Sequence, residues 1–379
     1  MANVVGRIIH QNGHIDLVHD ACKLCYKGKD EKDLDGKLKY IEDKIKAGHE
    51  SVIEHSNVIM LITDYGFNTN EMIEVMEASR HIHVKSHISD DGVCNYLIGG
   101  NIRAYKNIFR NISNQNNTIA KTILKTLYYT PKEYYYDFIQ AGIMEVRRFV
   151  DSEVIYEEYK PRPIYDSYTD RLTISNIDNI EEIYNKLKDY MRGEIIFSVE
   201  DILEMVTVTV FFKDMSRIIT QQVTRHRNPI SQQSQRYVDE SKAESNNPLT
   251  FTKYKDKNSK FNIDTLGEVT LDELAESMNN IYPQLRKQGL YKEDARYFLP
   301  QGVKSSLYMT FTFKSLIHFI NVRFTEEAQH EIRSVAKYLL WELESIHGDF
   351  LGDVFTYLIP KYALTETDYD INTISEIIE

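Results

Sequence analysis

One short segment of the sequence, residues 222–237, concentrates side chains that could bind a phosphate group. It holds three arginines, separated by hydroxyl and amide residues. A guanidinium binds phosphate oxygens through two parallel hydrogen bonds, while Ser and Gln side chains orient the rest of a ligand. On a helix, Gln222, Arg225 and His226 share one face. The segment therefore predicts a pocket for a phosphorylated ligand, with a solvated basic helix end as the structural alternative.

Two apolar runs predict the strands that position this chemistry. Residues 56–65 form a compact apolar run, and Val206–Val210 alternates with a period of two. After the second run Met215, Ile219 and Val223 follow helical spacing, and Pro229 ends that helix just past the arginines. We therefore expect a strand that leads directly into a helix and then into the polar segment.

The remaining predicted elements are mostly helical. We expect residues 1–50 to be mainly helical, and residues 101–109 to lie inside further helical material. Thr270 and Glu273 form a capping-box pattern that begins a helix with an apolar stripe at Leu274, Met278 and Ile281. A last helix is predicted from about Thr325 to Gly348, with Ala328, Ile332, Val335, Ala336, Leu339, Leu343 and Ile346 on one face. The polar residues 239–262 predict a surface excursion, and the fold class is α+β with helices dominant.

Composition sets the class of protein. The 379 residues are 42% hydrophobic and 27% charged, which is typical of a globular protein with a substantial core. No apolar run is long enough to span a membrane, and the first residues lack the pattern of a secretory signal. Three cysteines favour a reducing compartment, and we expect the cytoplasm. The net charge of −12 argues against a nucleic-acid partner, because such proteins need a basic face.

The polar segment resembles the signature of flavin-dependent thymidylate synthases. That signature is an Arg-His-Arg, a short spacer and Ser-x-Arg-Tyr, and here Arg225-His226-Arg227 is followed by Ser234-Gln235-Arg236-Tyr237. The spacer has six residues, one fewer than is usual in the family. Further similar segments are Ala21–Tyr26, Gly48-His49-Glu50-Ser51 with Glu54-His55, Asn101-x-Arg103 with Asn107, Asp294–Pro300, and Leu316–Glu331.

The order of these segments predicts an internal duplication. In a single-copy member the Glu-His pair lies shortly before Arg-His-Arg, whereas here His55 and Arg225 are separated by nearly half of the chain. Glu204-Met205 repeats the Glu54-His55 pattern without the His, and Thr312–His318 repeats the Asn101–Asn107 segment. We therefore predict the family fold, helix-rich with antiparallel sheet, in two tandem, partly degenerate copies. The predicted domains are residues 1–125, a connecting region at 126–195, and residues 196–379.

The resemblance implies methylation of dUMP to dTMP, with methylenetetrahydrofolate as carbon donor and reduced FAD, supplied by NADPH, as hydride source. Arg323 is the residue implied to activate the uracil ring, since a fixed positive charge favours the electron-rich, N3-deprotonated form. The implied dUMP contacts are Gln222, Arg225, Gln232, Gln233, Ser234, Gln235, Arg236, Arg296 and Arg323. The implied flavin contacts are His49, Ser51, Asn101, Arg103, Asn107, Arg225, His226, Arg227 and His318.

The losses in the two copies are complementary. The first copy lacks an Arg-His-Arg and has Ile112 where Arg323 would fall, and the second lacks the Gly-His-Glu-Ser segment and the paired asparagines. Active sites in the family form between subunits of a homotetramer. We therefore expect one composite site per chain, with flavin elements from the first copy and nucleotide elements from the second. A homo-oligomer, a dimer of chains, would then imitate the tetramer.

Several alternatives stay open at this point. Arg296 and Arg323 could form surface ion pairs with Glu293 and Glu327, His49 and His55 could be interior histidines, and Asn101 and Asn107 could lie on a helix surface. Cys22-x-x-Cys25 has no second pair to complete a zinc site, and His81, His83 and His87 are interpreted as the polar surface of a helix. No metal is expected. The competing functions are a catalytically inactive nucleotide- or flavin-binding relative and, less compatible with the charge, a nucleic-acid module.

Overall fold

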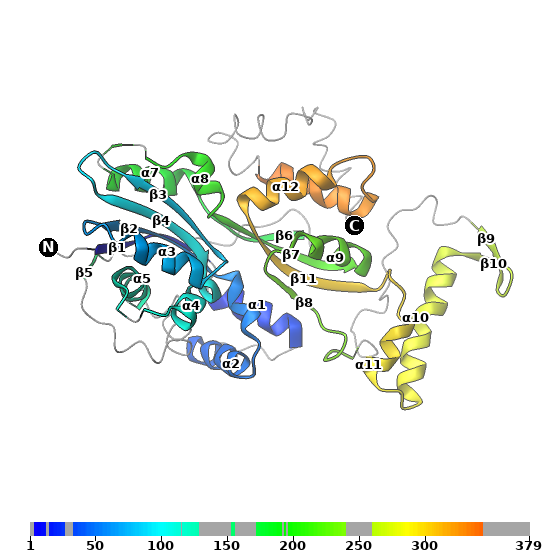
Figure 1. Ribbon diagram of the computed structural model, residues 1–379. Coiled ribbons are helices and arrows are strands. Elements are labelled where there is room, and N and C mark those ends of the chain that lie inside the picture. The colour runs from blue at the N-terminus through cyan, green and yellow to red at the C-terminus, as the bar shows by residue number, and fades with distance from the viewer. Residues whose placement is uncertain are drawn as a thin grey trace.

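The computed structural model describes residues 4–12, 15–26, 33–114, 116–128, 153–155, 172–191, 193–194, 196–239 and 260–343. Most of the predicted connecting region, residues 240–259 of the excursion predicted at 239–262, and Ile346 and Gly348 lie outside these residues. The described chain combines helices with mainly antiparallel sheets, so the predicted α+β class is confirmed. Figure 1 shows two sheets side by side, with helices on both faces.

The first sheet belongs to the N-terminal part of the chain. Its strand order is β3-β4-β2-β1-β5, with bounds Ile82–Ile88, Cys94–Asn101, Asn57–Asp64, Val4–Asn12 and Glu153–Ile155. Adjacent strands are antiparallel except β1 and β5, which are parallel. The strand predicted at 56–65 is confirmed as β2. We call residues 4–128 together with β5 the first unit.

Two expectations for the first unit were wrong. Residues 4–12 form strand β1 rather than helix, because their β-branched residues pair with the fully buried β2. Asn101 does not lie inside a helix but ends β4, and its side chain caps α4 by accepting from the Ala104 amide. Only the residues after it are helical.

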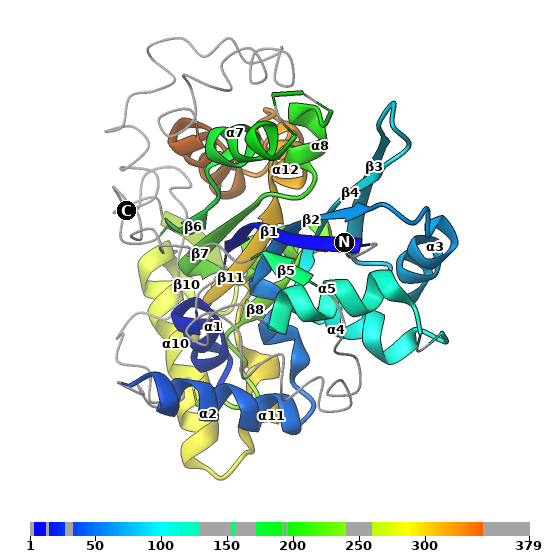
Figure 2. The ribbon, with the colours of Figure 1, turned by 90° about the vertical axis from the view of Figure 1, so that its left-hand side faces the viewer.

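Helices cover both faces of the first sheet. Ile59 and Leu61 of β2 pack with α7 (Ile180–Tyr190), whereas Val58 and Met60 point to the opposite face. That opposite face carries α3 (Thr69–Ala78), α4 (Ile102–Asn111) and α5 (Thr118–Tyr128). Figures 1 and 2 both show α7 and α4 on opposite sides of the sheet. Near the sheet lie α1 (Ile15–Tyr26), α2 (Leu34–Lys46) and the short η1 (Glu50–His55).

The second sheet has the order β6-β7-β11-β8. Its bounds are Leu172–Ile177, Thr207–Ser216, Lys304–Thr312 and Ile230–Gln232, and all its pairs are antiparallel. The strand predicted at 206–210 is confirmed as β7, and it leads into α9 (Arg217–Val223) and η3 (Thr224–His226). Met215, expected in that helix, still belongs to the strand. Because β6 and α7 lie in residues assigned to the connecting region, we define the second unit as residues 172–343.

The C-terminal described helices complete the second unit. After β11 come α12 (Phe313–Arg323) and a helix that starts at His330 and is described through Leu343. Thr325 was predicted to begin this last helix, but residues 324–329 form turns instead. The predicted apolar face is largely confirmed, because Ile332, Val335, Ala336, Leu339 and Leu343 are buried.

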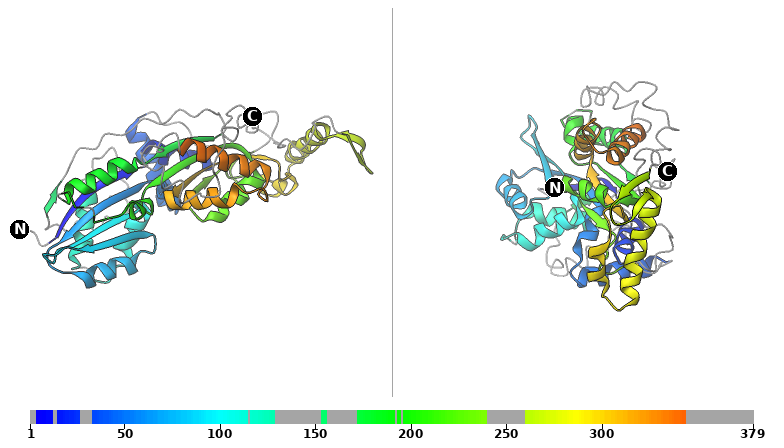
Figure 3. Two further views of the ribbon diagram at one scale, coloured as in Figure 1. Left: turned by 90° about the horizontal axis from the view of Figure 1, so that it is seen from above. Right: turned by 90° about the vertical axis from the view of Figure 1, so that its right-hand side faces the viewer.

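A helical arm extends from the second sheet. It contains the hairpin β9 (Lys260–Ile263) and β10 (Gly267–Thr270), then α10 (Leu271–Lys287), α11 (Lys292–Ala295) and η5 (Arg296–Phe298). The capping box of Thr270 and Glu273 is confirmed. The predicted stripe is wrong at Ile281, which is exposed, and the buried residues of α10 are Ala275 and Tyr282. Figure 3 shows the arm standing away from the sheets at one end of the molecule.

The two units have matching connectivity. In each unit a first strand and helices lead to a central strand, and after it come a helix, an edge strand, a strand that pairs with both the edge strand and the central strand, and a helix. The central strands begin alike: the Ile102 amide donates to the carbonyl of Ser56, just before β2, and the Phe313 amide donates to the carbonyl of Val206, just before β7. These bonds make Asn57 equivalent to Thr207, and Asn101 equivalent to Thr312.

Contacts between the units are reciprocal. α1 of the first unit packs on β8 and β11 of the second, and α7 of the second unit packs on β1 of the first. His55 contacts Thr310 of the second unit, and at the equivalent positions Met205 packs on Gly99 of the first. The His55–Thr310 and Met205–Gly99 contacts join equivalent positions, which is the pattern of a twofold-symmetric interface. The two units therefore face each other as the halves of a dimer do.

Gly99→Ala tests how tightly these halves are packed. A Cβ at this position would lie 2.6 Å from the Met205 Cβ, which is too close for two carbon atoms. We expect the substitution to lower the free energy of unfolding by about 1–3 kcal/mol, measured by chemical denaturation. Ser86→Ala, at an exposed position of β3, is the control and should stay within about 0.5 kcal/mol of the wild type. An unchanged Gly99→Ala midpoint would contradict the close packing of the units.

Candidate functional site

Arg323, at the end of α12, lies against the segment that follows α9. Its Nε donates to Nε2 of His226 at 3.2 Å, and its Nη2 donates to the Gln222 carbonyl at 3.3 Å. The His226 ring also lies 6.0 Å from the His318 ring between centroids. The structure therefore brings together four predicted site residues: Gln222, His226, His318 and Arg323. The alternative of a surface ion pair between Arg323 and Glu327 is not observed among the described residues.

The electrostatics of this cluster keep His226 neutral. Burial, and then the positive charge of Arg323, lower the pKa of His226 to about 4. A neutral imidazole has one free nitrogen lone pair, so Nε2 can accept the Arg323 hydrogen bond. Burial and the nearby Arg225 lower the pKa of Arg323, but a guanidinium stays charged in proteins. The cluster thus presents a fixed cation held in place by a neutral histidine.

Arg227 ends the Arg-His-Arg segment in a conformation that favours glycine. Its φ is 56° and its ψ is 33°, in the left-handed region. A non-glycine residue there costs of the order of 1 kcal/mol, and such strain often occurs at functional sites. Asn228 fixes the turn, because its amide donates to the His226 carbonyl and its carbonyl oxygen accepts from Ser315.

Arg227 lines a groove between the two units, which we call the inter-unit groove. The groove encloses about 680 Å³, part of it open to solvent. Both units contribute to its wall: Glu54, Asn57, Arg80, His81, His83, Gly99, Gly100 and Asn101 from the first, and Met205, Thr207, Arg227, Asn228, Pro229, Thr310 and Thr312 from the second. Two predicted flavin contacts from different units, Asn101 and Arg227, therefore meet here.

The other predicted flavin contacts of the first unit are more dispersed. Arg103 pairs with Glu54, which lines the groove, and the equivalent Lys314 pairs with Glu204. Asn107 is half-buried on α4, and Ser51 is exposed on η1. The His49 ring lies 5.0 Å from the Tyr26 ring between centroids, on the side of the molecule where Tyr237 also contacts Tyr26. His49 is therefore grouped with the Ser-x-Arg-Tyr loop rather than with Asn101.

The predicted nucleotide loop begins at β8. Gln232 donates to the Thr220 and Ser305 hydroxyls, and the Gln233 amide donates to the Ser306 carbonyl. Ser234 Oγ accepts from the Arg236 amide. Gln235 is buried, and its Nε2 atom has no hydrogen-bond partner in the described structure. A buried donor without a partner costs about 1–3 kcal/mol, so the loop keeps an amide that a ligand could satisfy.

Arg236 and Arg296 meet at one glutamate on α11. Arg236 lies 3.7 Å from the Glu293 carboxylate, with both side chains more than half exposed, and Arg296 Nε donates to the Glu293 carbonyl. The alternative of an ion pair between the Arg296 and Glu293 side chains is not observed in the described residues. An exposed pair at this distance contributes little to stability, so Arg236 is available for a phosphate.

His55 is fully buried at the contact between the units. Its Nδ1 lies 2.8 Å from the Thr310 hydroxyl and its Nε2 lies 2.9 Å from the Ser231 hydroxyl. Burial lowers the pKa of His55 to about 4, so the ring is neutral. The interior-histidine alternative holds for His55. Because Ser231 belongs to β8, this side chain joins the first unit to the start of the nucleotide loop.

Three residues that line the groove, Arg80, His81 and His83, were not predicted as site residues. His81, His83 and His87 were expected on a helix surface, but His83 and His87 lie in β3, and His81 directly precedes it. The one signal for Arg80 and His81 was their position shortly after the helix α3, just as Arg225–Arg227 follow α9.

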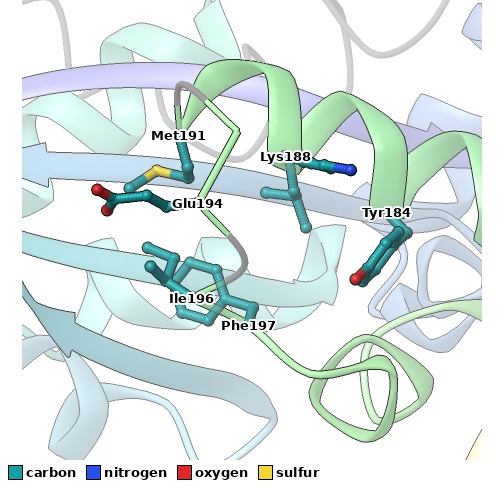
Figure 4. Close-up of a pocket in the computed structure, with 7 residues that line it drawn as sticks. Tyr184, Lys188, Met191, Glu194, Ile196 and Phe197 are labelled. Carbon is teal, nitrogen blue, oxygen red and sulfur yellow. The ribbon is translucent and has the colours of Figure 1, made fainter.

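Among the described residues no group of three or more side chains could hold a metal ion, and Cys22 and Cys25 lie on α1. A second hollow, under the end of α7, is lined by Tyr184, Leu187, Lys188, Met191, Glu194, Ile196 and Phe197. Figure 4 shows that mainly apolar side chains surround it. It contains none of the predicted site residues. Among the described helices, none combines the length and apolar character needed to cross a membrane.

A comparison with family models places the likeness mainly in the second unit. The family model described as "Thymidylate synthase complementing protein" matches residues 159–347. The flavin-dependent thymidylate synthase of Pyrococcus abyssi is 33% identical over 180 residues, which are 47% of this chain and 70% of that protein. The one from Thermococcus kodakarensis is 33% identical over 192 residues, 49% of this chain and 76% of that protein.

Among solved structures, the flavin-dependent thymidylate synthase ThyX of Helicobacter pylori complexed with FAD and dUMP is 17% identical. The match covers 47% of this chain and 95% of that chain, with a TM-score of 0.34.

The buried His55 predicts a pH dependence of stability. Its folded pKa of about 4 lies below the unfolded value of about 6.5, so the unfolded state binds more protons between these values. The contribution of His55 is therefore complete above pH 6.5 and is lost as the pH falls to about 4, a loss of about 3 kcal/mol. In His55→Asn this part of the pH dependence should disappear, measured by urea denaturation from pH 4 to 8. A His55→Asn curve that runs parallel to the wild-type curve over this pH range would contradict the burial of His55.

Proposed function

Because this chain belongs to the flavin-dependent thymidylate synthase family, we propose that it methylates dUMP to dTMP, with methylenetetrahydrofolate as carbon donor and reduced FAD, supplied by NADPH, as hydride source. The observation that carries the proposal is the Arg323 cluster. Arg323, His226 and Gln222 lie within the matched residues and are in hydrogen-bond contact in the structure. A guanidinium held in this way supplies a positive charge without rearrangement during the reaction.

Arg323 is the proposed activating residue. Its charge beside a uracil ring would stabilise the N3-deprotonated, electron-rich ring, which makes C5 more nucleophilic. The neutral His226 accepts the Nε hydrogen bond and the Gln222 carbonyl accepts another, so two contacts fix the plane of the guanidinium. The flavin, when bound, supplies the hydride that completes the methyl group.

The loop after β8 is the proposed phosphate and sugar site for dUMP. Arg236 and Arg296 both contact Glu293, and Gln235 provides a buried amide with no partner in the described structure. Ser234, Gln232 and Gln233 provide the neutral hydrogen-bonding groups that orient a ligand. Arginine is suited to this task because its planar fork matches two phosphate oxygens.

We propose the inter-unit groove as the flavin site. It contains Asn101, Arg227 and Glu54, the partner of Arg103, and it adjoins the Asn228 turn that reaches back to His226. The guanidinium of Arg227 has no carboxylate partner among the described side chains, which fits a group that meets a phosphate. In this arrangement the flavin elements come from both units and the nucleotide elements from the second.

The matched connectivity and reciprocal contacts of the units support an origin by duplication of one family domain. Each chain would then hold one composite site, and a homodimer of chains would imitate the family's tetramer. The three cysteines are free, which supports the cytoplasm as the compartment of this protein.

Arg323→Gln tests the proposed chemistry. We expect kcat/KM for dUMP to fall by at least about a hundredfold, because the variant loses a preorganised charge that acts mainly in the transition state. The assay is dUMP-dependent oxidation of NADPH in the presence of FAD and methylenetetrahydrofolate. Arg333→Gln is the matched control: Arg333 only donates to the Glu326 carbonyl on the surface, so its activity should stay within about threefold.

Two results would contradict the proposal. Full activity of Arg323→Gln would exclude the assigned role of the residue. Wild-type protein that binds dUMP and FAD without dUMP-dependent NADPH oxidation would identify the chain as an inactive relative. The spacer of six residues between Arg227 and Ser234, one fewer than is usual in the family, is the feature that favours this alternative.

A further inference from the structure

A buried glutamate at the start of the last described helix contacts the end of β7. Glu331 is 6% exposed, and both of its carboxylate oxygens accept hydrogen bonds from one residue. The Ser216 amide donates to Oε1 at 3.0 Å, and the Ser216 hydroxyl donates to Oε2 at 2.5 Å. A buried carboxylate is costly unless hydrogen bonds satisfy it, so this pair fixes the end of β7 against the last helix.

Ser216 passes this contact on to α9. It is the N-cap of α9, and its hydroxyl oxygen accepts from the Ile219 amide at 3.3 Å while its hydrogen is donated to Glu331. Because α9 has only seven residues, about two turns, the position of its first turn determines where its last residue lies. The carboxylate also stabilises the helix, since a negative charge is favourable beside a helix N-terminus. Glu331 therefore helps to set the position of the residues that directly follow α9, including His226.

The other end of α9 contacts the same stretch of chain. Gln222, in the last turn of α9, donates through its Nε2 to Oε1 of Gln329. Its carbonyl accepts from Arg323 Nη2 at 3.3 Å, and Arg323 also donates to His226. We call residues 323–331 the α9 clamp, because they contact the first and the last turn of one short helix. With both ends held, α9 cannot shift along its axis without breaking at least one of these contacts.

The corresponding helix of the first unit is held differently in the described residues. This helix is α3, and its N-cap Asn68 makes no side-chain cap hydrogen bond. The glutamate that joins it to the next helix but one lies on α3 itself, where Glu71 accepts from the Thr118 amide at the start of α5. The first unit also has Ile112 where Arg323 would fall. The glutamate that holds the first residue of the helix therefore occurs in the unit that has the proposed activating arginine.

We propose that Glu331 is a positioning residue for the reaction: through Ser216 it fixes α9, and so keeps His226 in hydrogen-bond contact with Arg323. This inference rests on the proposed function, and Glu331 acts through Ser216 rather than through a ligand. An arginine that stabilises a transition state has to be held close to its productive position, because a misplacement of about 1 Å can cost about a hundredfold in rate. The α9 clamp supplies that precision.

Glu331→Gln and Ser216→Ala, alone and together, test the clamp in the full chain. The first variant is nearly isosteric, but an amide nitrogen cannot accept from the Ser216 hydroxyl. Glu342→Gln is the matched control. Glu342 is also a buried carboxylate of the last helix, it accepts from the Tyr338 hydroxyl, and it lies about three turns farther along that helix.

Histidine NMR of the ligand-free protein reports on the clamp independently of activity. In the wild type, burial and the charge of Arg323 lower the pKa of His226 to about 4, so its ring resonances should stay constant between about pH 5 and 8. In Glu331→Gln, release of α9 should separate His226 from Arg323 and raise the pKa of His226 toward its ordinary value near 6.5. Glu342→Gln should match the wild type. The His226 resonance is assigned by its absence in His226→Asn.

Steady-state kinetics measure the consequence for the reaction. We expect kcat of dUMP-dependent NADPH oxidation to fall about tenfold or more in Glu331→Gln and in Ser216→Ala, because the charge of Arg323 is no longer held in place. The dissociation constant of dUMP should change less than kcat, since the loop after β8 still binds the phosphate. The double variant should lose no more than the weaker single variant, and Glu342→Gln should stay within about threefold of the wild type.

Three results would overturn the inference. A pKa of His226 that stays low in Glu331→Gln would show that the contact with Ser216 does not hold the pair of His226 and Arg323. Equal losses of kcat in Glu331→Gln and Glu342→Gln would leave Glu331 with a general structural role. Losses that multiply in the double variant would show that Glu331 does not act through Ser216. Wild-type protein without activity would instead overturn the proposed function, while the histidine titration would still show whether the clamp holds His226.

Discussion

The contact between the ends of β2 and β7 is the constraint on which both candidate sites depend. Asn57 donates to the Met205 carbonyl, and His55 bridges to Thr310 and Ser231. Thr310 in turn hydrogen-bonds Thr209, so a chain of buried polar groups passes from one unit into the central strands of the other. Buried polar groups of this kind are costly unless each has a partner, which makes one relative placement of the units strongly preferred. That placement forms the groove on one side and fixes the start of the nucleotide loop on the other.

The charges follow from the same arrangement. The chain is acidic as a whole, yet in its second unit Arg225 and Arg323 lie near the neutral His226. Burial and the neighbouring cations keep His226 unprotonated, so it can hold Arg323 instead of repelling it. Carboxylates that could neutralise the groove are paired elsewhere, as Glu50 is with Lys106 and Arg110. Local positive potential in an acidic protein is what a site for phosphorylated small molecules requires.

Sequence reasoning identified features that are encoded locally. The strands β2 and β7, the capping box at Thr270, and the apolar face of the last helix each follow from short patterns of residues, and each is confirmed. The motif residues Gln222, His226, His318 and Arg323 were also named from the sequence, and the structure brings them together. Their roles in binding and catalysis stay predictions.

The features that the sequence did not reveal depend on non-local pairing. β1 was missed because its residues do not alternate strictly, and only pairing with β2 makes them a strand. His83 and His87 gave no strand signal until β3 was seen beside β4. Arg80 could not be recognised from its neighbours in the sequence, because it lines a groove whose wall comes from both units. The sequence did not decide whether His55 contacts a ligand or is an interior histidine, because its partners Ser231 and Thr310 are distant in the sequence.

The central claim is that two units of one chain build one composite site. The number of ligands bound per chain tests it most directly, by equilibrium dialysis of purified protein with FAD and dUMP together. The composite-site account predicts one equivalent of FAD and one of dUMP per chain, with dUMP binding lost in Arg236→Gln. Two equivalents of dUMP per chain, or none of FAD, would contradict it.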